Sequence, residues 1–253
     1  MFFGVGMVYA GGGDTVWNEY DSQGERHGFW RAYYNNGRLK YRAEFSHGRA
    51  VGRTTRYSGG GQVVSVMDYG SDGHTCQVVI YDEMGRVEGR GGYYDRRKDG
   101  KWEYFSGRRL IREEGWRRGL KHGRFVEYQD NGHKGSVGSW SNGEMDGLQE
   151  QYYGNGALRM RWKMVRGVEQ GPSVTYYPNG AVRLRGQFRD GKRDGIWRFY
   201  TPRGKVEREQ EYRSGELVRG DRSGEVDSML RVLMGNKGKI PEPRAGGRGY
   251  LSY

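Results

Sequence analysis

Aromatic and aliphatic residues recur along the chain at a fixed spacing, and glycines separate them. Gly123, Gly147, Gly171 and Gly195 stand 24 residues apart, and a tyrosine follows each of them five residues later. The same spacing runs back towards the N-terminus as far as Gly28. An internal period of this length indicates stacked repeats rather than a single globular core. Residues that recur in every copy are therefore expected to build the array.

Eight copies of the unit lie between His27 and Val218. Each has a leading glycine, an aromatic residue five positions later, a second glycine, an aliphatic residue, a second bulky residue and, in most copies, a closing glycine. The third copy carries Cys76 in the leading-glycine slot, and the fourth has lost one residue around Ser106-Gly107. The aromatic residues of the fifth position are Tyr33, Tyr57, Tyr81, Phe105, Tyr128, Tyr152, Tyr176 and Tyr200.

Each unit is predicted to form a β-hairpin, because short tracts rich in aromatic and β-branched residues lie between glycine turns. In Pro178-Asn179-Gly180 the proline suits the first central position of a type I turn, and the glycine suits a left-handed G1 bulge. A two-residue type I′ turn would require positive φ at Met84 and Arg203, which is unfavourable. The three-residue turn places Tyr33 across from Leu39 and Tyr176 across from Val182. We therefore predict an all-β, elongated, single-layer antiparallel meander of about eight 24-residue hairpins.

The predicted array covers residues 27–218 and leaves two ends. Residues 1–26 are predicted to comprise a leader remnant and a half-repeat cap over Trp17–Gly24. Residues 219–253 form a basic tail, in which Asp227–Met234 is predicted to form a short capping helix. Met1–Ala10 is apolar but lacks a basic start, so it predicts either the end of an export leader, with the protein in the cell envelope, or a cytoplasmic protein with a frayed tail. No segment is long enough to span a membrane.

The unit Asp194-Gly-Ile-Trp-Arg-Phe-Tyr200, with the turn glycine, aliphatic, aromatic and closing glycine that follow it, resembles a MORN repeat. The likeness is greatest to the bacterial YwqK-type variant, which is often filed as an antitoxin family. This resemblance implies a repeat scaffold that binds proteins, dimerises or binds anionic lipids, and it leaves a toxin–antitoxin role open.

The search for catalytic chemistry is negative. His27 and His122 occupy one slot, before the leading glycine, where other copies carry residues such as Asp99 or Gln170, so this slot is interpreted as a turn position. Cys76 is the single cysteine and has no identifiable general base. We therefore predict no enzyme activity, no cofactor and no metal site.

Charge is the clearest functional signal. The chain has 43 Lys and Arg against 31 Asp and Glu, a net charge of +12 that favours anionic partners. In the second strand of several units, basic residues alternate with apolar ones and so share one strand face. This face is either a merely solvated sheet face or a docking surface. A docking surface would bind a protein, anionic lipid or another polyanion. Among these partners we favour a protein, and nucleic acid is not expected. Trp30, Trp102 and Trp197 are candidates for the same face, although the aromatic residues are interpreted as structural. The candidate binding residues are Lys40, Arg42, Arg159, Arg161, Lys163, Arg183 and Arg185.

Overall fold

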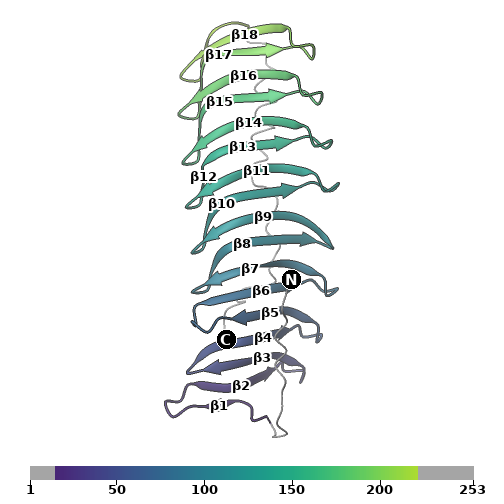
Figure 1. Cartoon of the computed structure of the whole chain (residues 1–253), viewed down its shortest axis with the longest axis vertical. Coiled ribbons are helices and arrows are strands. Elements are labelled where there is room, and N and C mark those ends of the chain that lie inside the picture. Colours follow the sequence, from purple (N-terminus) through teal and green to yellow (C-terminus); the bar gives the residue numbers. More distant parts are fainter. Residues whose placement is uncertain (1–14, 222–253) are drawn as a thin grey trace, which may run out of the picture. The chain divides into compact units, whose positions relative to one another are not determined.

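The computed structural model describes residues 15–221, which form two units that meet in sequence at Gly73 and His74 (Figure 1). Every regular element in this range is a β-strand. The predicted helix at Asp227–Met234 and the leader segment lie outside the described residues. Unit 1 contains β1 (Glu19–Tyr20), β2 (Arg26–Tyr33), β3 (Leu39–Ser46), β4 (Arg49–Tyr57) and β5 (Val63–Tyr69). Unit 2 contains β6 (Thr75–Tyr81), β7 (Val87–Tyr94), β8 (Arg97–Ser106), β9 (Arg109–Arg117), β10 (Leu120–Tyr128), β11 (Lys134–Ser141), β12 (Glu144–Met145), β13 (Gly147–Tyr152), β14 (Leu158–Val165), β15 (Val168–Tyr176), β16 (Val182–Arg189), β17 (Lys192–Tyr200), β18 (Val206–Arg213) and β19 (Glu216–Arg219).

Within each unit, strands pair antiparallel with their neighbours in chain order, which makes an open meander. The short strand β12 and the following β13 both pair with β11, so these two act as one interrupted strand. Strand β1 pairs with β2, as the half-repeat at the N-terminal end predicts. The all-β hairpin meander expected from the sequence is therefore confirmed.

The middle turn of each hairpin has the predicted geometry. The N–H of Gly180 donates to the carbonyl of Tyr177 at 2.9 Å, and Gly180 has a φ of +85°. Tyr176 lies across from Val182 in the resulting register, and Tyr33 lies across from Leu39. The fourth 24-residue repeat is the exception, because the loss of one residue leaves a two-residue turn between Ser106 and Arg109.

The turn between successive hairpins, here called the closing turn, contains the third glycine of the unit. Asp190 and Gly191 have φ values of +51° and +75° and connect the paired residues Arg189 and Lys192. Two successive positive φ values define a type I′ turn, which matches the right-handed twist of the strands. The closing turn of the third repeat has Asp95 and Arg96 at these two positions. In other two-residue closing turns, the first position is His47, Arg118, Asn142, Arg166 or Ser214.

The leading glycine makes a bulge in the first strand of the hairpin. Gly195 has a φ of +70°, and the register between β16 and β17 shifts around it, between Arg185 and Gln187. Gly171 has a φ of +77° at the equivalent point of β15. Because a side chain disfavours this backbone conformation, the glycine recurs at this position. Cys76 occupies the slot in the third unit without a positive φ.

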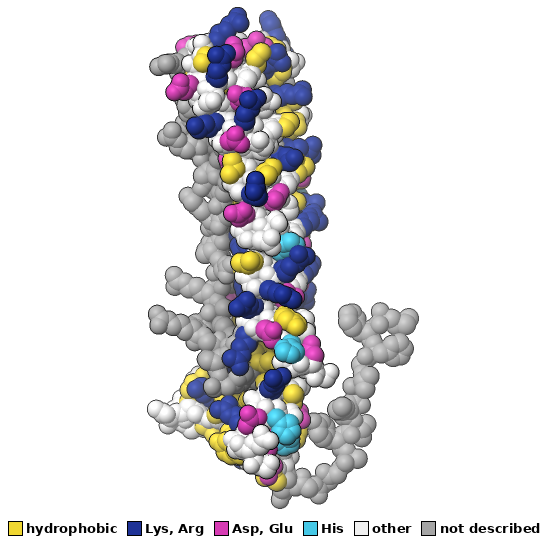
Figure 2. All heavy atoms as spheres, turned by 90° about the vertical axis from the view of Figure 1, so that its left-hand side faces the viewer, with side chains coloured by type: hydrophobic (Ala, Val, Ile, Leu, Met, Phe, Trp, Pro, Cys, Tyr) yellow, Lys and Arg dark blue, Asp and Glu magenta, His cyan; other side chains and the backbone are white. Residues whose placement is uncertain are grey.

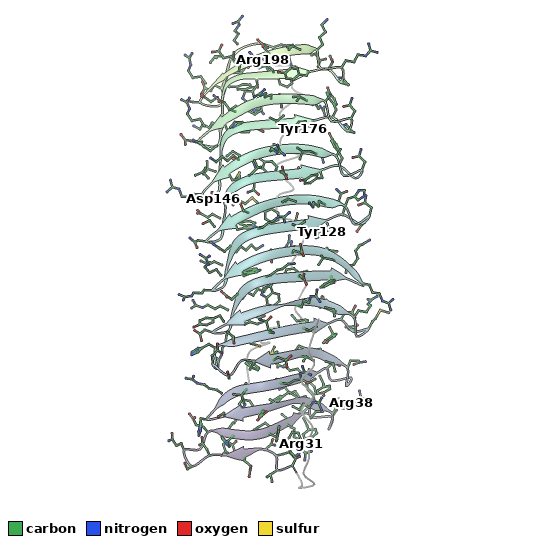
Figure 3. All side chains as sticks on the ribbon, in the orientation of Figure 1. Arg31, Arg38, Tyr128, Asp146, Tyr176 and Arg198 are labelled. Atoms are coloured by element: carbon green, nitrogen blue, oxygen red, sulfur yellow. The ribbon has the colours of Figure 1, made fainter. Side chains whose placement is uncertain are left out.

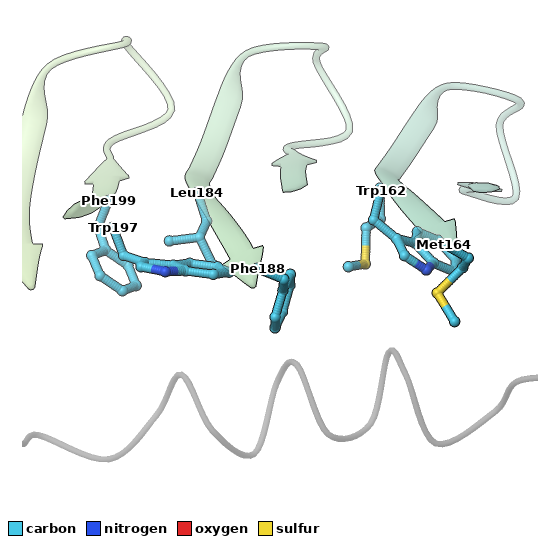
Figure 4. Packing of buried hydrophobic residues seen from close by; sticks show 7 residues of the cluster. Trp162, Met164, Leu184, Phe188, Trp197 and Phe199 are labelled. Carbon is cyan, nitrogen blue, oxygen red and sulfur yellow. The ribbon is translucent and has the colours of Figure 1, made fainter. Parts of the chain in front are cut away.

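Apolar side chains gather on one face of each sheet, the apolar face. In unit 2 this face holds a cluster in which Trp197 packs with Leu184 and Phe188 (Figure 4). In unit 1, Trp30 packs with Tyr41 and Phe45. Trp102 is also buried, with 1% of its surface exposed. The expectation that these tryptophans share the basic face is therefore wrong, since the bulge at the leading glycine directs them into the core.

Candidate functional site

The seven predicted binding residues lie opposite the apolar face, on what we call the polar face. In β14, exposed Arg161 and Lys163 alternate with buried Met160, Trp162 and Met164. Strands β3 and β16 show the same alternation, with Lys40 and Arg42 in unit 1 and Arg183 and Arg185 in unit 2. The structure thus places Arg159, Arg161, Lys163, Arg183 and Arg185 on two strands of unit 2 that are separated only by β15.

A row of directly opposed residues crosses the polar face of unit 2. Arg161 forms a 2.7 Å ion pair with Glu150 at one end of the row, and Arg198 pairs with Glu209 at 2.6 Å at the other. Between them, Arg185 lies opposite Arg198 with no carboxylate between the two. Figure 2 shows the same mixture of basic and acidic side chains on another side of unit 2. In order from β13 to β18, the row is Glu150, Arg161, Val174, Arg185, Arg198 and Glu209.

Tyrosines of the fifth position anchor carboxylates on this face. The Tyr152 hydroxyl donates to Glu150 at 2.6 Å, and the Tyr128 hydroxyl donates to Glu113 at 3.0 Å. Burial raises the pKa of Tyr152, and its hydrogen bond to Glu150 raises it further, to about 12. Burial alone would raise the pKa of Glu150, but the hydrogen bonds from Tyr152 and Arg161 outweigh it and lower that pKa. In Figure 3, Tyr128 and Tyr176 lie near the middle turns, and Asp146 lies towards the closing turns.

Three of the predicted binding residues stack on tyrosines at the middle turns. Arg183 lies over the Tyr177 ring at 5.5 Å, and Arg159 lies over Tyr153 at 5.6 Å. Lys40 repeats this contact in unit 1, over Tyr34 at 5.9 Å. The hydroxyls of the same tyrosines donate to the backbone of the next hairpin, for example from Tyr177 to Tyr200 at 2.8 Å. These three cations therefore help to support contacts between repeats.

Two further predicted cations, Lys163 and Arg185, lie near exposed apolar side chains, whereas Arg161 pairs with Glu150 and Arg42 lies opposite Arg31. Lys163 lies opposite Leu148, whose surface is 52% exposed. Ile196, 48% exposed, precedes Arg198 on the same face of β17, and Arg198 lies opposite Arg185. Neither Lys163 nor Arg185 forms an ion pair with another described residue. We call Leu148, Lys163, Arg185 and Ile196 the mixed patch.

Sequence reasoning missed the apolar members of the mixed patch. Leu148 and Ile196 follow the leading glycine, a position that carries Phe29, Arg53 or Lys101 in other copies. This variability hides the position from a search for recurring residues. The variability could itself have served as a signal. Positions that build the array recur in every copy, so an exposed position that varies between copies is free to serve binding.

The apolar face of unit 2 also contains buried charges that the sequence did not single out. Arg112, 5% exposed, donates to Glu127 at 2.6 Å. The neighbouring Glu114 carboxylate forms an ion pair with Lys121 at 3.3 Å and accepts a hydrogen bond from the Trp116 indole at 3.1 Å. Near the shortened turn of the fourth unit, a hollow of about 390 Å³ is lined by Arg86, Arg90, Phe105 and Arg108, among others. Two of its arginines already pair with carboxylates, Arg86 with Asp82 and Arg90 with Glu103.

The slot before the leading glycine behaves as a turn position in two of the 24-residue repeats, both in unit 2. Asp99 accepts a hydrogen bond from the backbone N–H of Arg118 at 2.9 Å, and Gln170 accepts one from Asp190 at 2.7 Å. In unit 1, by contrast, His27 lies in this slot beside His47 and Asp21. The sequence offered no ligand-spaced partner for His27, because His47 comes from a closing turn and Asp21 from the first loop.

A model of the MORN repeat variant family matches residues 193–214, which span the hairpin of β17 and β18. The array therefore contains a MORN-type repeat at this hairpin. No curated protein matches the sequence. No helix of the kind that crosses a bilayer, long and apolar, is found among residues 15–221.

Several solved structures show distant similarity to the chain. A TcdB2–TccC3–Cdc42 complex is 11% identical, with a TM-score of 0.17, over 77% of this chain and 15% of that one. The Photorhabdus luminescens Tc holotoxin pore is 12% identical, with a TM-score of 0.20, over 78% and 15%. A porin-like protein from Bacteroides uniformis is 13% identical, with a TM-score of 0.16, over 76% and 86%. The chain thus spans only a small part of the first two, and none of these likenesses carries an argument about function.

Proposed function

We propose that the chain is a non-catalytic repeat scaffold whose polar face in unit 2 binds a protein partner. The mixed patch carries this proposal. It combines exposed Leu148 and Ile196 with Lys163 and Arg185, two cations that form no ion pair with another described residue. Exposed apolar groups that adjoin arginine are typical of protein interfaces. An antitoxin-like role, in which the partner is a toxin, is one form of this proposal and rests on the family resemblance alone.

The charge arrangement favours a partner with acidic side chains. Arg185 lies opposite Arg198, and like charges in directly opposed positions are destabilising. Glu209 already pairs with Arg198, so a carboxylate from a partner would accept hydrogen bonds from Arg185, which forms no ion pair with another described residue. Such a contact uses charge and geometry together, so it is expected to persist at physiological salt.

The alternative is binding of anionic lipid or another polyanion, which the net charge of +12 favours. Attraction to an anionic membrane amounts to about 1 kcal/mol per basic residue near the surface and weakens with salt. Glu150 and Glu209 pair with two cations of the same row, which lowers the field that a membrane would sense. The protein partner is for this reason the proposal that we prefer.

A charge reversal on the polar face tests the proposal. Lys163→Glu/Arg185→Glu changes the mixed patch, and Arg203→Glu/Lys205→Glu makes the same change in charge at an exposed middle turn. Each is compared with wild type for capture of proteins from an extract of the native organism at physiological salt, and for binding to phosphatidylserine vesicles at low and physiological salt. We expect a captured protein that wild type and the turn variant retain and the patch variant loses.

A second variant, Leu148→Ser/Ile196→Ser, separates the two hypotheses. Protein binding requires the apolar side chains, so this variant is expected to lose the captured protein. Membrane attraction is electrostatic and would tolerate the change. Vesicle binding that survives this change, with no salt-resistant protein captured, would support the lipid alternative. Equal capture by the patch and turn variants would show that the partner binds elsewhere.

A further inference from the structure

Three potential metal ligands converge in unit 1 from separate parts of the chain. Asp21 lies in the loop between β1 and β2, His27 in β2, and His47 in the closing turn between β3 and β4. Each offers one ligand atom, and these atoms all lie within 4.8 Å of one another. Nδ1 of His47 lies 2.8 Å from Oδ2 of Asp21, and the two imidazole rings have centroids 5.2 Å apart.

The backbone holds the carboxylate and the turn in place. Oδ1 of Asp21 accepts hydrogen bonds from the N–H groups of Gln23 and Glu25, each at 2.9 Å, which leaves Oδ2 directed at His47. The N–H of Gly48 donates to the carbonyl of Arg26 at 2.9 Å, which fixes the closing turn beside β2. Asp21 is 10% exposed and His47 is 71% exposed, so one ligand is rigid and another is free to adjust.

The turn that contains Asp21 differs from the two-residue closing turns. The N–H of Gly24 donates to the carbonyl of Asp21 at 3.0 Å, and Gly24 has a φ of +77°. This is the three-residue geometry of a middle turn, although the half-repeat pattern assigns Gly24 to the closing-glycine slot. The longer loop brings the Asp21 carboxylate against His47, and these two residues with His27 form the one group of three potential ligands among the described residues.

The turn role that this slot has in other repeats does not account for His27. In other units its slot holds Asp99 or Gln170, which accept a backbone hydrogen bond from the closing turn. The His27 side chain forms no hydrogen bond with a described residue, although its ring lies beside His47. Two further carboxylates lie close by, since Glu19 lies opposite His27 and the Glu25 side chain approaches Gly48.

We propose that Asp21, His27 and His47 form a surface site for a borderline divalent ion such as Zn²⁺. Two imidazoles and a carboxylate are a ligand set that suits Zn²⁺ and leaves a fourth position for water or a further ligand. Tetrahedral ligands at about 2.0–2.1 Å from zinc lie roughly 3.3 Å apart. The ion would take the place of the proton shared by Asp21 and His47, which would move slightly apart, while the ligand atoms that lie up to 4.8 Å apart would move closer. A bound ion would link the β1–β2 loop and β2 to the closing turn between β3 and β4.

Zinc titration of the full chain tests the site. Calorimetry measures Zn²⁺ binding, and Co²⁺ in place of Zn²⁺ reports the ligands through its visible absorption. His47→Asn removes a ligand while keeping a residue that already fills the equivalent turn position at Asn142. His27→Gln does the same for its slot, where Gln170 stands in another unit. His133→Asn removes a histidine outside the cluster and is the matched control.

We expect one Zn²⁺ per chain for wild type and for His133→Asn, with a rise in thermal midpoint on binding. Affinity should fall about tenfold or more in His47→Asn and in His27→Gln, since even the loss of groups that only orient ligands costs that much. Circular dichroism verifies that both variants remain folded. Absence of stoichiometric binding by wild type would overturn the proposal, as would undiminished affinity in both folded variants.

Discussion

The indole of Trp197 lies over Gly186 of the preceding strand, so closely that a Cβ on Gly186 would lie 2.1 Å from the ring. Trp102 and Gly91 repeat this relationship, with a distance of 2.3 Å. Between β14 and β15 the sizes are reversed, because Trp162 lies opposite the small Ser173. Successive hairpins are thus matched in volume on the apolar face.

This match predicts that Gly186→Ala destabilises unit 2. The new methyl overlaps the indole, and overpacking of this kind costs about 1–3 kcal/mol. Gly154→Ala is the control, because the nearest atom to its Cβ is Oε1 of Gln129 at 3.6 Å. Urea denaturation of both variants measures the difference. Adding Trp197→Phe should recover part of the loss in Gly186→Ala, and no recovery would contradict the proposed contact.

Arg96→Gly should stabilise the protein. Arg96 has a φ of +61° at a closing-turn position where other copies carry glycine. A left-handed residue with a side chain costs about 1–2 kcal/mol, which glycine avoids. Arg108→Gly removes the same charge from a turn residue without positive φ and serves as the comparison. A thermal midpoint for Arg96→Gly no higher than that of Arg108→Gly would contradict the argument.

The leading glycine is tested most cleanly at Gly171. No heavy atom lies within 4 Å of a Cβ at this position, so substitution changes only the backbone preference. Gly171→Ala should lower the free energy of unfolding by about 1–2 kcal/mol, and Gly171→Asn should lower it less, since asparagine tolerates positive φ. The order of the two variants in chemical denaturation decides the point; an equal effect would indicate a cause other than φ.

The Tyr152–Glu150 hydrogen bond predicts a loss of stability at high pH. The pKa of Tyr152 is raised from 10.0 to about 12 in the folded state. The stabilisation is thus complete below pH 10, where the phenol is protonated in both states, and it is lost as the pH rises through about 12. Tyr152→Phe should show a shallower decline in unfolding free energy across this window. Tyr33→Phe, which removes an exposed phenol, gives the baseline, and identical slopes would refute the prediction.

The buried Arg112–Glu127 pair predicts strong non-additivity. Arg112→Met leaves the Glu127 carboxylate, 12% exposed, without its cation, and such a loss costs about 3–5 kcal/mol. Arg112→Met/Glu127→Leu removes both charges and should be closer to wild type. A double-mutant cycle by denaturation measures the coupling. Additive losses would show that the pair is not coupled.

Much of the fold could be predicted from periodicity. Glycine and aromatic spacing identified the hairpins, and Pro178 with Gly180 identified the middle turn, because proline and glycine restrict φ locally. The alternation of basic and apolar residues in β14 and β16 placed the cations on one face, because strand side chains alternate.

Contacts between residues far apart in sequence were decided only by the tertiary structure. The bulge at each leading glycine shifts the register, and so Trp197 lies in the core although alternation alone left its face open. Pairing of β14 with β13 brings Glu150 to Arg161 and neutralises one predicted binding residue, while Lys163 and Arg185 form no ion pair within the described part of the chain. The cluster of Asp21, His27 and His47 depends on a loop one residue longer than a type I′ turn. Short sequence patterns determine local conformational preferences. The partners of a side chain depend instead on how neighbouring strands are aligned, and a single bulge changes that alignment.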